Sequence, residues 1–263
     1  MSARLNLTLS VYTGIVVFLL ALPILVVIPA SFNASSSLGM PHGPLSLRWY
    51  LGLGGHPEFV SAFLVTLRVA VLSSLGALLL GVAAARALRR MRARWREGLQ
   101  LLFLSPLLLP GVSLGAGMLL FMGPLRLTRS LLGLALAHTV VTLPYVTRTV
   151  YATMVAVDPS IEDAASTLGA NPIRIMWHVI LPIIRPALLA AATFAWIVSF
   201  DEFTVSLFIV GGKAVTLPIA MFQYTEFVID PTILAIATVL VLLSVGIIVT
   251  VERTIGFERY FRI

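Results

Sequence analysis

Long apolar runs separated by short polar stretches dominate the chain. A helix that crosses a bilayer needs about 20 mostly apolar residues, and runs of that length cover approximately residues 10–31, 62–86, 99–121, 131–154, 186–209 and 231–251. The first run exceeds the apolar core of a cleavable signal peptide, which has about 7–15 residues, so we expect it to be retained. The pattern predicts an all-α membrane protein, with six transmembrane helices forming one domain over residues 1–263.

Proline and glycine interrupt two of these predicted spans. The third span contains Pro106 and Pro110, followed by Gly111 and Gly115, and the fourth contains Pro144. Proline frees backbone groups that neighbouring helices or a cavity must satisfy, while glycines four residues apart allow two helices to approach closely. Such features suit helices that surround a pathway, although incidental packing explains many glycine pairs of this kind.

The basic residues gather on one side of the predicted spans. The connection 86–97 alone holds six arginines, and the same side carries Arg4, Arg174, Arg185, Arg253, Arg259 and Arg262. The other side has Arg48, Arg126, Arg129 and Lys213, with Arg68 near a span end. Because cytoplasmic loops are enriched in lysine and arginine, both termini and the loop 155–185 are predicted to be cytoplasmic.

Composition agrees with a membrane protein and argues against several kinds of site. Charged residues make up 11% of the chain and hydrophobic residues 59%, whereas soluble proteins average about 25% charged residues. The net charge of +7 follows the predicted topology, so we expect no nucleic-acid partner. Cysteine is absent, the four histidines show no metal-ligand spacing, and no phosphate-binding loop occurs. We therefore expect no catalytic residue and no metal site.

The stretch IEDAASTLGANPIRIMWHVILP, residues 161–182, is too polar to cross a bilayer. Asp158 followed by Pro159 is a typical helix start, and Glu162 and Asp163 fall in or next to the first turn, where negative charge is favourable. Gly169 is typical of a helix end in the left-handed conformation. The pair Asn171–Pro172 repeats the start signal, which predicts a second short helix running toward Pro182.

One face of the first short helix carries small and apolar residues. Ile161, Ala164, Ala165 and Leu168 share this face at helical spacing. An amphipathic connector on the membrane surface is one interpretation. A docking helix is the other, since alanines permit close approach to a groove in another protein.

Two adjacent acids, Asp201 and Glu202, lie inside the predicted fifth span. A charged side chain at the centre of a span costs about 2.5–3.5 kcal/mol. One interpretation is that one of these carboxylates, with Ser199 nearby, helps a cationic substrate to pass. The other is a structural role, either an ion pair, for which Arg68 is a candidate, or a cap on a helix turn.

Residues 210–230 follow this span as a segment with an apolar and aromatic cluster. Its members are Met221, Phe222, Tyr224 and Phe227. We expect a short helix at the membrane interface that meets a soluble substrate-binding protein, and an aromatic belt at the lipid surface is an equal alternative.

The segment DAASTLGANPIRIMWHVILP resembles the EAA loop of permease subunits in ABC importers. The matched positions are Asp163, Ala164, Ala165, Gly169, Val179, Leu181 and Pro182. Aspartate replaces the usual glutamate at the first of them, which would shorten the reach of an ion pair with a partner. The segments IPASFNASS, SLRWY, VTLRVA, SFDEFTVSLFIVGG and TLPIAMF resemble, in the same order, the spermidine/putrescine-type permeases of the polyamine, opine and phosphonate family.

This resemblance implies a type I ABC importer (MetI-like) permease fold in a bacterial inner membrane. Residues 158–182 would form the coupling-helix loop, which in the family sits in a groove of the cytosolic ATPase. The coupling residues would be Glu162, Asp163, Ala164, Ala165, Leu168 and Gly169. The implied partners are a second permease, two ATPase subunits that bind ATP and magnesium, and a periplasmic substrate-binding protein, so this chain itself would be no enzyme and would hold no cofactor.

The resemblance favours a polyamine substrate but leaves alternatives open. The same family includes importers of opines, phosphonates and other small anions. A secondary transporter that works without an ATPase, with Asp201 and Glu202 as an ion relay, is a more distant alternative. A membrane scaffold that moves no solute is another.

Overall fold

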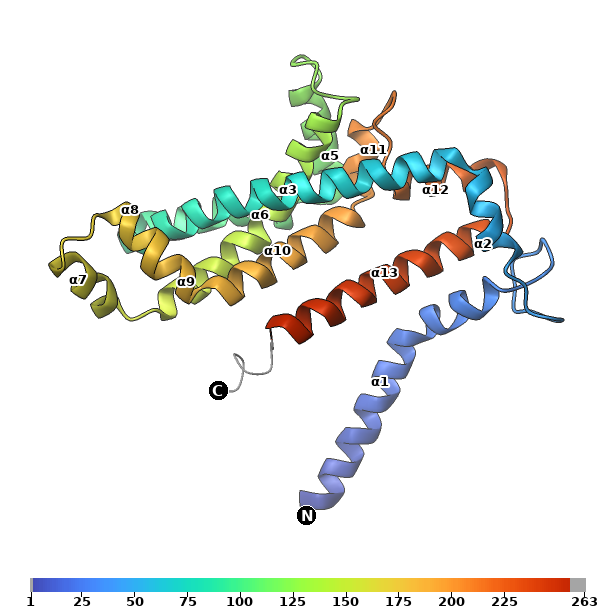
Figure 1. Cartoon of the computed structure of the whole chain (residues 1–263), viewed down its shortest axis with the longest axis horizontal. Helices are drawn as coiled ribbons and strands as arrows, with labels where there is room; N and C mark the ends of the chain where they lie inside the picture. Colours follow the sequence, from blue (N-terminus) through green and yellow to red (C-terminus); the bar gives the residue numbers. More distant parts are fainter. Residues whose placement is uncertain (1, 256–263) are drawn as a thin grey trace. The chain divides into compact units, whose positions relative to one another are not determined.

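A computed structural model describes residues 2–255 of the chain, and all regular secondary structure in that range is helical (Figure 1). The predicted all-α class is therefore confirmed. The chain divides into two compact units, residues 1–60 with 221–247 and residues 61–220 with 248–263. Arg259 and Arg262, which entered the topology prediction, lie outside the described residues, as does the side chain of Arg4.

The first unit contains α1 (Ser2–Ala30), α2 (Arg48–Gly52), a 3-10 turn η1 (Leu53–Gly55) and most of α13 (Thr232–Ile255). Side-chain hydrogen bonds to the backbone hold the connection between α1 and α2. The Trp49 indole donates to the Asn33 carbonyl over 2.7 Å, and the Asn33 amide donates to the carbonyls of Ser37 and Gly39. This connection is an ordered loop because its polar backbone is satisfied locally.

The predicted short helix after residue 210 is present as α12 (Leu217–Phe227). Its second half belongs to the first unit, where the Tyr224 ring lies 5.2 Å from Phe59 and 5.7 Å from His56. The Tyr224 hydroxyl donates to Asp230 at 3.0 Å. Tyr224 is thus an internal packing residue, whereas Phe222 and Phe227 are exposed.

The second unit is built on three long helices, α3 (Pro57–Arg90), α6 (Leu131–Ala156) and α10 (Arg185–Phe200) (Figure 1). Val146, Val150 and Met154 of α6 form the centre of one core cluster, against alanines of α3 and α10. Small residues bring the helices close together: a Cβ on Gly81 of α3 would meet Val146 Cγ1 at 2.7 Å. Close helix contact through small residues is the packing expected of membrane helices.

The predicted third span is two helices rather than one. α4 (Ala93–Leu108) and α5 (Gly111–Met122) meet at an angle of 102°. Leu109 is extended (φ −83°, ψ 141°) because a residue before proline is sterically excluded from the helical region. The expectation of a continuous helix over 99–121 is therefore corrected to a helix broken at Leu109–Pro110.

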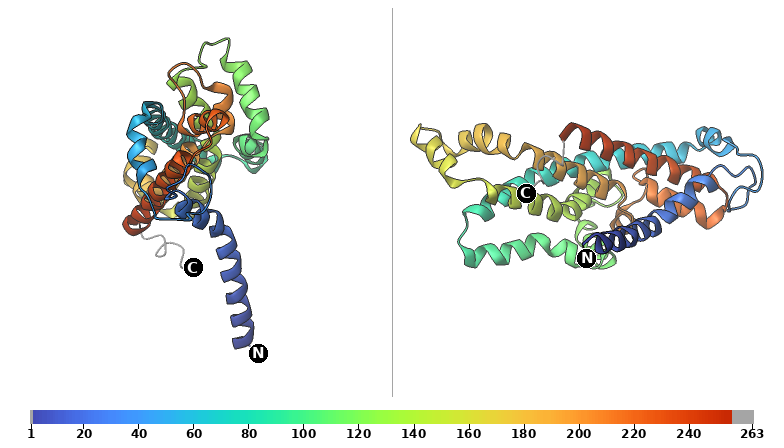
Figure 2. Two further views of the ribbon diagram at one scale, coloured as in Figure 1. Left: turned by 90° about the vertical axis from the view of Figure 1, so that its right-hand side faces the viewer. Right: turned by 90° about the horizontal axis from the view of Figure 1, so that it is seen from below.

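The predicted fifth span is also broken. α10 ends at Phe200, Asp201–Phe203 are non-helical, and α11 (Thr204–Ile209) follows. The segment before α10 comprises α7 (Pro159–Thr167), α8 (Pro172–Ile175), a π-helical turn η2 (Met176–Ile180) and α9 (Leu181–Ile183). It extends beyond the end of α6 in the second unit (Figures 1 and 2).

The number of spans depends on how the bent helices are counted. Four helices among the described residues are long and apolar enough to cross a membrane, and six spans result if each bent pair crosses once. The pairs are α4 with α5, and the α8–α9 segment with α10.

Gly111 and Gly115 form the contact between α5 and α11. A Cβ on Gly111 would lie 3.0 Å from Thr204 Cγ2, and one on Gly115 would lie 2.5 Å from Phe208 Cδ2. Because both contacts advance by four residues, the two short helices run parallel. The glycine pair therefore serves close packing between the two broken spans.

Replacing Gly115 with valine should destabilise this contact, because the added methyl groups overlap the Phe208 ring. Overpacking costs about 1–3 kcal/mol. Gly117 of the same helix has no atom within 4 Å of its Cβ position, so Gly117→Val is the matched control. Thermal unfolding in detergent should show a lower midpoint for Gly115→Val than for Gly117→Val, and equal midpoints would contradict the contact.

Candidate functional site

Helix α7 begins and ends as the sequence predicts. The Asp158 carboxylate accepts the Ser160 backbone N–H at 2.9 Å, with Pro159 in the first turn. At the other end Gly169 has φ +82°, and its N–H donates to the Ser166 carbonyl while Ala170 N–H donates to Ala165. This pair of bonds is a Schellman motif, whose left-handed residue favours glycine. The local signals are therefore sufficient to fix α7.

The second predicted helix start, at Asn171–Pro172, is also present in the structure. Asn171 Oδ1 accepts the Arg174 N–H at 2.8 Å, and Pro172 occupies the first turn of α8. The helical path continues through η2 and α9 before it bends by 76° into α10. The predicted helix toward Pro182 is thus confirmed, with a π-helical turn inside it.

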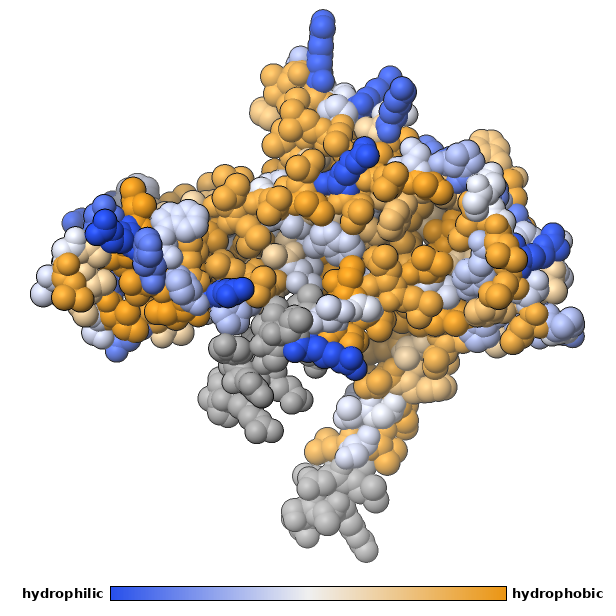
Figure 3. All heavy atoms as spheres, viewed as in Figure 1, coloured by the Kyte–Doolittle hydropathy of each residue, from blue (hydrophilic) through white to orange (hydrophobic). Residues whose placement is uncertain are grey.

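The predicted apolar face of α7 is divided between inside and outside. Ala165 packs against the core cluster of the second unit, together with Ala170. Ala164 and Gly169 are exposed, and Leu168 is 89% exposed. On the face seen in Figure 3, hydrophilic and apolar side chains are mixed at this end of the second unit, while apolar side chains predominate over its long helices. Ile173 and Trp177 of the following segment are also exposed, at 71% and 66%, so Leu168 is one of several exposed apolar side chains at this end.

Glu162 points away from this surface and toward α3. Its carboxylate accepts two hydrogen bonds from Arg86, at 2.6 and 2.7 Å, and a further one from Arg89. The more exposed Arg90 guanidinium lies 3.5 Å from the same carboxylate. The side chains of Glu162, Arg86 and Arg89 are only 15%, 14% and 12% exposed. The sequence placed Glu162 among the contacts to an ATPase, but the structure shows its carboxylate engaged within the chain.

Three guanidinium groups favour the ionised form of Glu162. The hydrogen bond from Arg86 is the main influence that lowers the pKa of this carboxyl below its usual value, with smaller contributions from Arg89 and Arg90. Glu162 is therefore ionised at neutral pH. Asp163, the next residue, is exposed and forms no ion pair within residues 2–255. The two acids thus have different surroundings although they are adjacent.

Asp201 and Glu202 do not lie in a helix, which corrects the expectation that they are consecutive residues of one. Asp201 closes α10 with φ −96° and ψ 1°. Glu202 Oε1 accepts the Val205 N–H at 2.8 Å at the start of α11, so the structural alternative, a cap on a helix turn, describes Glu202. No ion pair joins Arg68 to either acid in the described part of the chain. Asp201 is exposed.

Ser199 belongs to a buried hydrogen-bond network rather than to an open surface. Its hydroxyl lies 2.8 Å from Ser73 of α3 and 2.8 Å from His138 Nδ1 of α6. His138 Nε2 lies 2.8 Å from the Ser206 hydroxyl, which donates to the Glu202 carbonyl. The network joins four helices at the break between α10 and α11.

The sequence shows no metal-ligand spacing among its histidines, and the network around His138 was not predicted from it. The available signal was its position in the middle of an apolar span, where ionisable residues are rare and normally have a partner. Its partners are distant in sequence, so only the fold brings them together.

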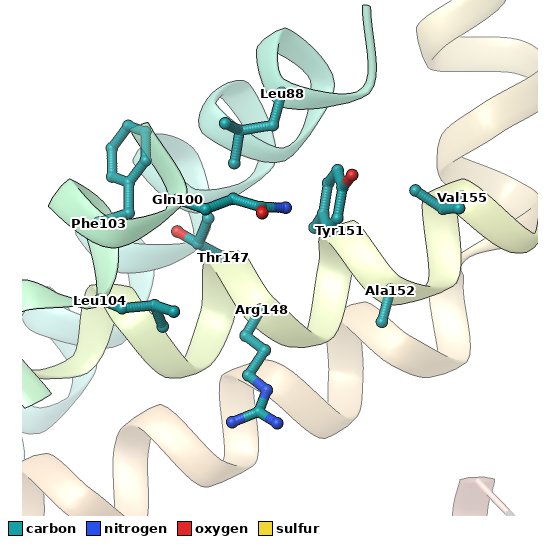
Figure 4. A pocket seen from close by; sticks show the side chains of 9 residues that line it. All are labelled: Leu88, Gln100, Phe103, Leu104, Thr147, Arg148, Tyr151, Ala152 and Val155. Carbon is teal, nitrogen blue, oxygen red and sulfur yellow. The ribbon is translucent and has the colours of Figure 1, made fainter. Parts of the chain in front are cut away.

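A cavity of about 520 Å³ lies near the same end of the second unit as α7, between α3, α4 and α6. Figure 4 shows the Gln100 side chain extending toward Tyr151, while Arg148 points away from both. Within residues 2–255, the buried Thr147 hydroxyl has no hydrogen-bond partner. The lining is mostly apolar, and no group of His, Asp or Glu capable of holding a metal ion occurs among the described residues.

Residues 77–255 match the family described as binding-protein-dependent transport system inner membrane component. The putrescine transport system permease protein PotI of Escherichia coli (strain K12) is 33% identical over 233 residues, which cover 86% of this chain and 82% of PotI. The spermidine/putrescine transport system permease protein PotC of the same strain is 29% identical, with 88% and 87% covered. A putative 2-aminoethylphosphonate permease, PhnV of Salmonella typhimurium (strain LT2), is 30% identical, with 88% of each covered.

Solved structures show the same fold. A chain of a bacterial ABC transporter involved in alginate import superposes with a TM-score of 0.72 and 16% identity, covering 99% of this chain and 98% of the other. A chain of the MetNI methionine ABC transporter gives a TM-score of 0.64 and 22% identity, covering 75% and 94%. The predicted type I importer permease fold is confirmed.

Replacing Ser199 with alanine should destabilise the fold, because it removes the buried hydroxyl that contacts both His138 Nδ1 and Ser73, although His138 keeps Ser206 and Ser73 keeps the Ala70 carbonyl. The net contribution of a buried hydrogen bond is about 0.5–1.5 kcal/mol. Thr193→Ala in the same helix removes a hydroxyl that bonds only its own helix backbone, and should change stability by less than about 0.5 kcal/mol. Thermal unfolding of both variants in detergent measures the difference, and a Ser199→Ala midpoint equal to that of Thr193→Ala would contradict a stabilising network.

Proposed function

Because the chain belongs to the family of binding-protein-dependent transport system inner membrane components, we propose that it is one of two permease subunits of an ATP-driven importer. The second permease completes the solute pathway. Two cytosolic ATPase subunits bind ATP and magnesium, and an external binding protein delivers the substrate. This chain contributes no catalytic residue and holds no cofactor.

The exposed surface at the end of α7 is the main support for the proposal that this helix couples the permease to an ATPase. Leu168 is 89% exposed at the end of a short helix that is capped at both ends, and it stands beside exposed Ala164 and Gly169. An apolar side chain with small neighbours fits a groove in another protein, and exposed Asp163 adds a charge for recognition. Asp163, Ala164, Leu168 and Gly169 are therefore the residues that we assign to contact with the ATPase.

Coupling requires that the ATPase contacts differ between two states of the importer. Closure of the ATPase subunits on ATP moves α7, and the segment α8–α9 carries this movement into α10. The pathway then alternates between access from outside and access from inside. In this arrangement the membrane is a bacterial inner membrane, and both termini and the α7–α9 segment are cytoplasmic.

The arginines of the second unit support this orientation. Arg86, Arg89 and Arg90 lie at the same end of the unit as α7. Arg129 lies just before the start of α6, at the opposite end, and its backbone N–H donates to the Ile209 carbonyl. The concentration of arginine near α7 is typical of a cytoplasmic end.

A polyamine is the substrate that we propose, on the basis of the similarity to PotI and PotC. Asp201 supplies an exposed carboxylate at the helix break, and we assign it to contact with the cation. We assign Glu202 and Ser199 an indirect role. Their hydrogen bonds hold the break between α10 and α11, and this break in turn influences the shape of the pathway. The similarity to PhnV keeps a phosphonate as the second candidate.

The test is substrate-stimulated ATP hydrolysis and uptake by the full reconstituted importer carrying Leu168→Glu. A buried apolar residue at an interface centre contributes about 2 kcal/mol or more, so association with the ATPase should weaken about thirtyfold. Leu168→Met keeps the apolar contact and should retain transport. Full transport by Leu168→Glu would contradict the docking role of α7.

The wild-type importer in the same assay identifies the substrate class. Stimulation by putrescine or spermidine, but not by 2-aminoethylphosphonate, is the expected result. The reverse result would replace the polyamine by an anion and remove the role assigned to Asp201.

A further inference from the structure

One carboxylate and two guanidinium groups form a largely buried ion-pair cluster between α7 and α3. Glu162 binds Arg86 through both carboxylate oxygens and also binds Arg89. Arg89 donates in addition to the Val157 carbonyl at 2.9 Å, in the turn that connects α6 to α7. Three segments of the chain therefore meet at a single ion-pair cluster.

Apolar packing contributes little to the attachment of α7. Within α7, Glu162 and Ala165 are the two residues that are not exposed, and alanine has a small side chain to bury. The chain connects α7 directly to α6 and, through Gly169–Asn171, to α8, but no chain connection joins it to α3. The contact between α7 and α3 therefore depends on the Glu162 cluster.

We propose that Glu162 is a positioning residue that fastens α7 to α3, so that the coupling helix moves α3 as well as the helices next to it in sequence. This inference rests on the proposed docking of α7 to an ATPase. It separates the two adjacent acids: Asp163 faces the partner, and Glu162 transmits the movement within the permease.

The bond geometry suits a mechanical connection. A bidentate arginine–carboxylate pair fixes both distance and orientation, and charge-assisted hydrogen bonds are stronger than neutral ones. Removing one partner of a buried pair leaves the other charges uncompensated, here on Arg86 and Arg89. The cluster therefore holds the two helices in one relative position more firmly than the single exposed pair with Arg90 would.

The first experiment compares Glu162→Gln with Asp163→Asn in the full reconstituted importer. Each variant removes one negative charge, at adjacent positions. Glu162→Gln should retain binding of the ATPase and basal ATP hydrolysis, while substrate uptake per ATP falls about 5- to 150-fold, the usual range of coupling between sites. Asp163→Asn should leave uptake per ATP unchanged in the complexes that assemble. Unchanged uptake per ATP in Glu162→Gln would overturn the proposal.

A covalent replacement distinguishes a mechanical connection from a general loss of structure. The chain contains no cysteine, so Arg86→Cys/Glu162→Cys carries only the two introduced thiols. Uptake per ATP should be low in this variant and should recover when a bifunctional thiol reagent bridges the two positions. Glu162→Cys with the same reagent is the control and should not recover. Failure of the bridged variant to recover would also overturn the proposal.

Leu168→Glu in the same preparation separates this inference from the proposed function. If Leu168→Glu blocks transport and Glu162→Gln does not, docking stands and the connection to α3 is wrong. If Leu168→Glu transports normally, the docking role of α7 fails first.

Discussion

Backbone and polar groups inside a bilayer need partners from the protein, because lipid supplies none. This constraint is strongest where α10 ends and α11 begins, since the chain leaves its helical hydrogen bonds there. Glu202 satisfies the start of α11 through Val205, and Ser206 satisfies the Glu202 carbonyl. His138 and Ser199 then connect this break to α6 and α3. Four helices thus contribute hydrogen bonds to this helix break.

The same reasoning explains why the α7–α9 segment is polar. Its caps and exposed acids require water, and Glu162 requires the arginines of α3, so the segment lies beyond the apolar flanks of the long helices. In the function that we propose, an ATPase moves this segment, which therefore has to lie outside the bilayer and be firmly attached to helices inside it. The capped ends of α7 supply local rigidity, and the Glu162 cluster supplies the attachment to α3.

Local signals in the sequence predicted local structure well. Asp158, Asn171 and Gly169 each act through residues within five positions of themselves, so the ends of α7 and the start of α8 followed from the sequence. The glycine pair of α5 was recognised, but not its partner α11. The pairing of Glu162 with arginines of α3 did not follow from the sequence, because those arginines are more than 70 residues away. The network of Ser73, His138, Ser199 and Ser206 has no short-range pattern at all.

The contact of Gly111 with Thr204 brings the first turns of α5 and α11 together, with both helices running in the same direction. The amino-terminal end of a helix carries a partial positive charge from its aligned peptide dipoles. Glu202 accepts the Val205 N–H at the start of α11, so the positive end of this helix partly neutralises its charge and lowers its electrostatic cost below that of a carboxylate halfway along a continuous helix. Asp201 lies at the carboxy-terminal end of α10, where the helix dipole gives no such compensation.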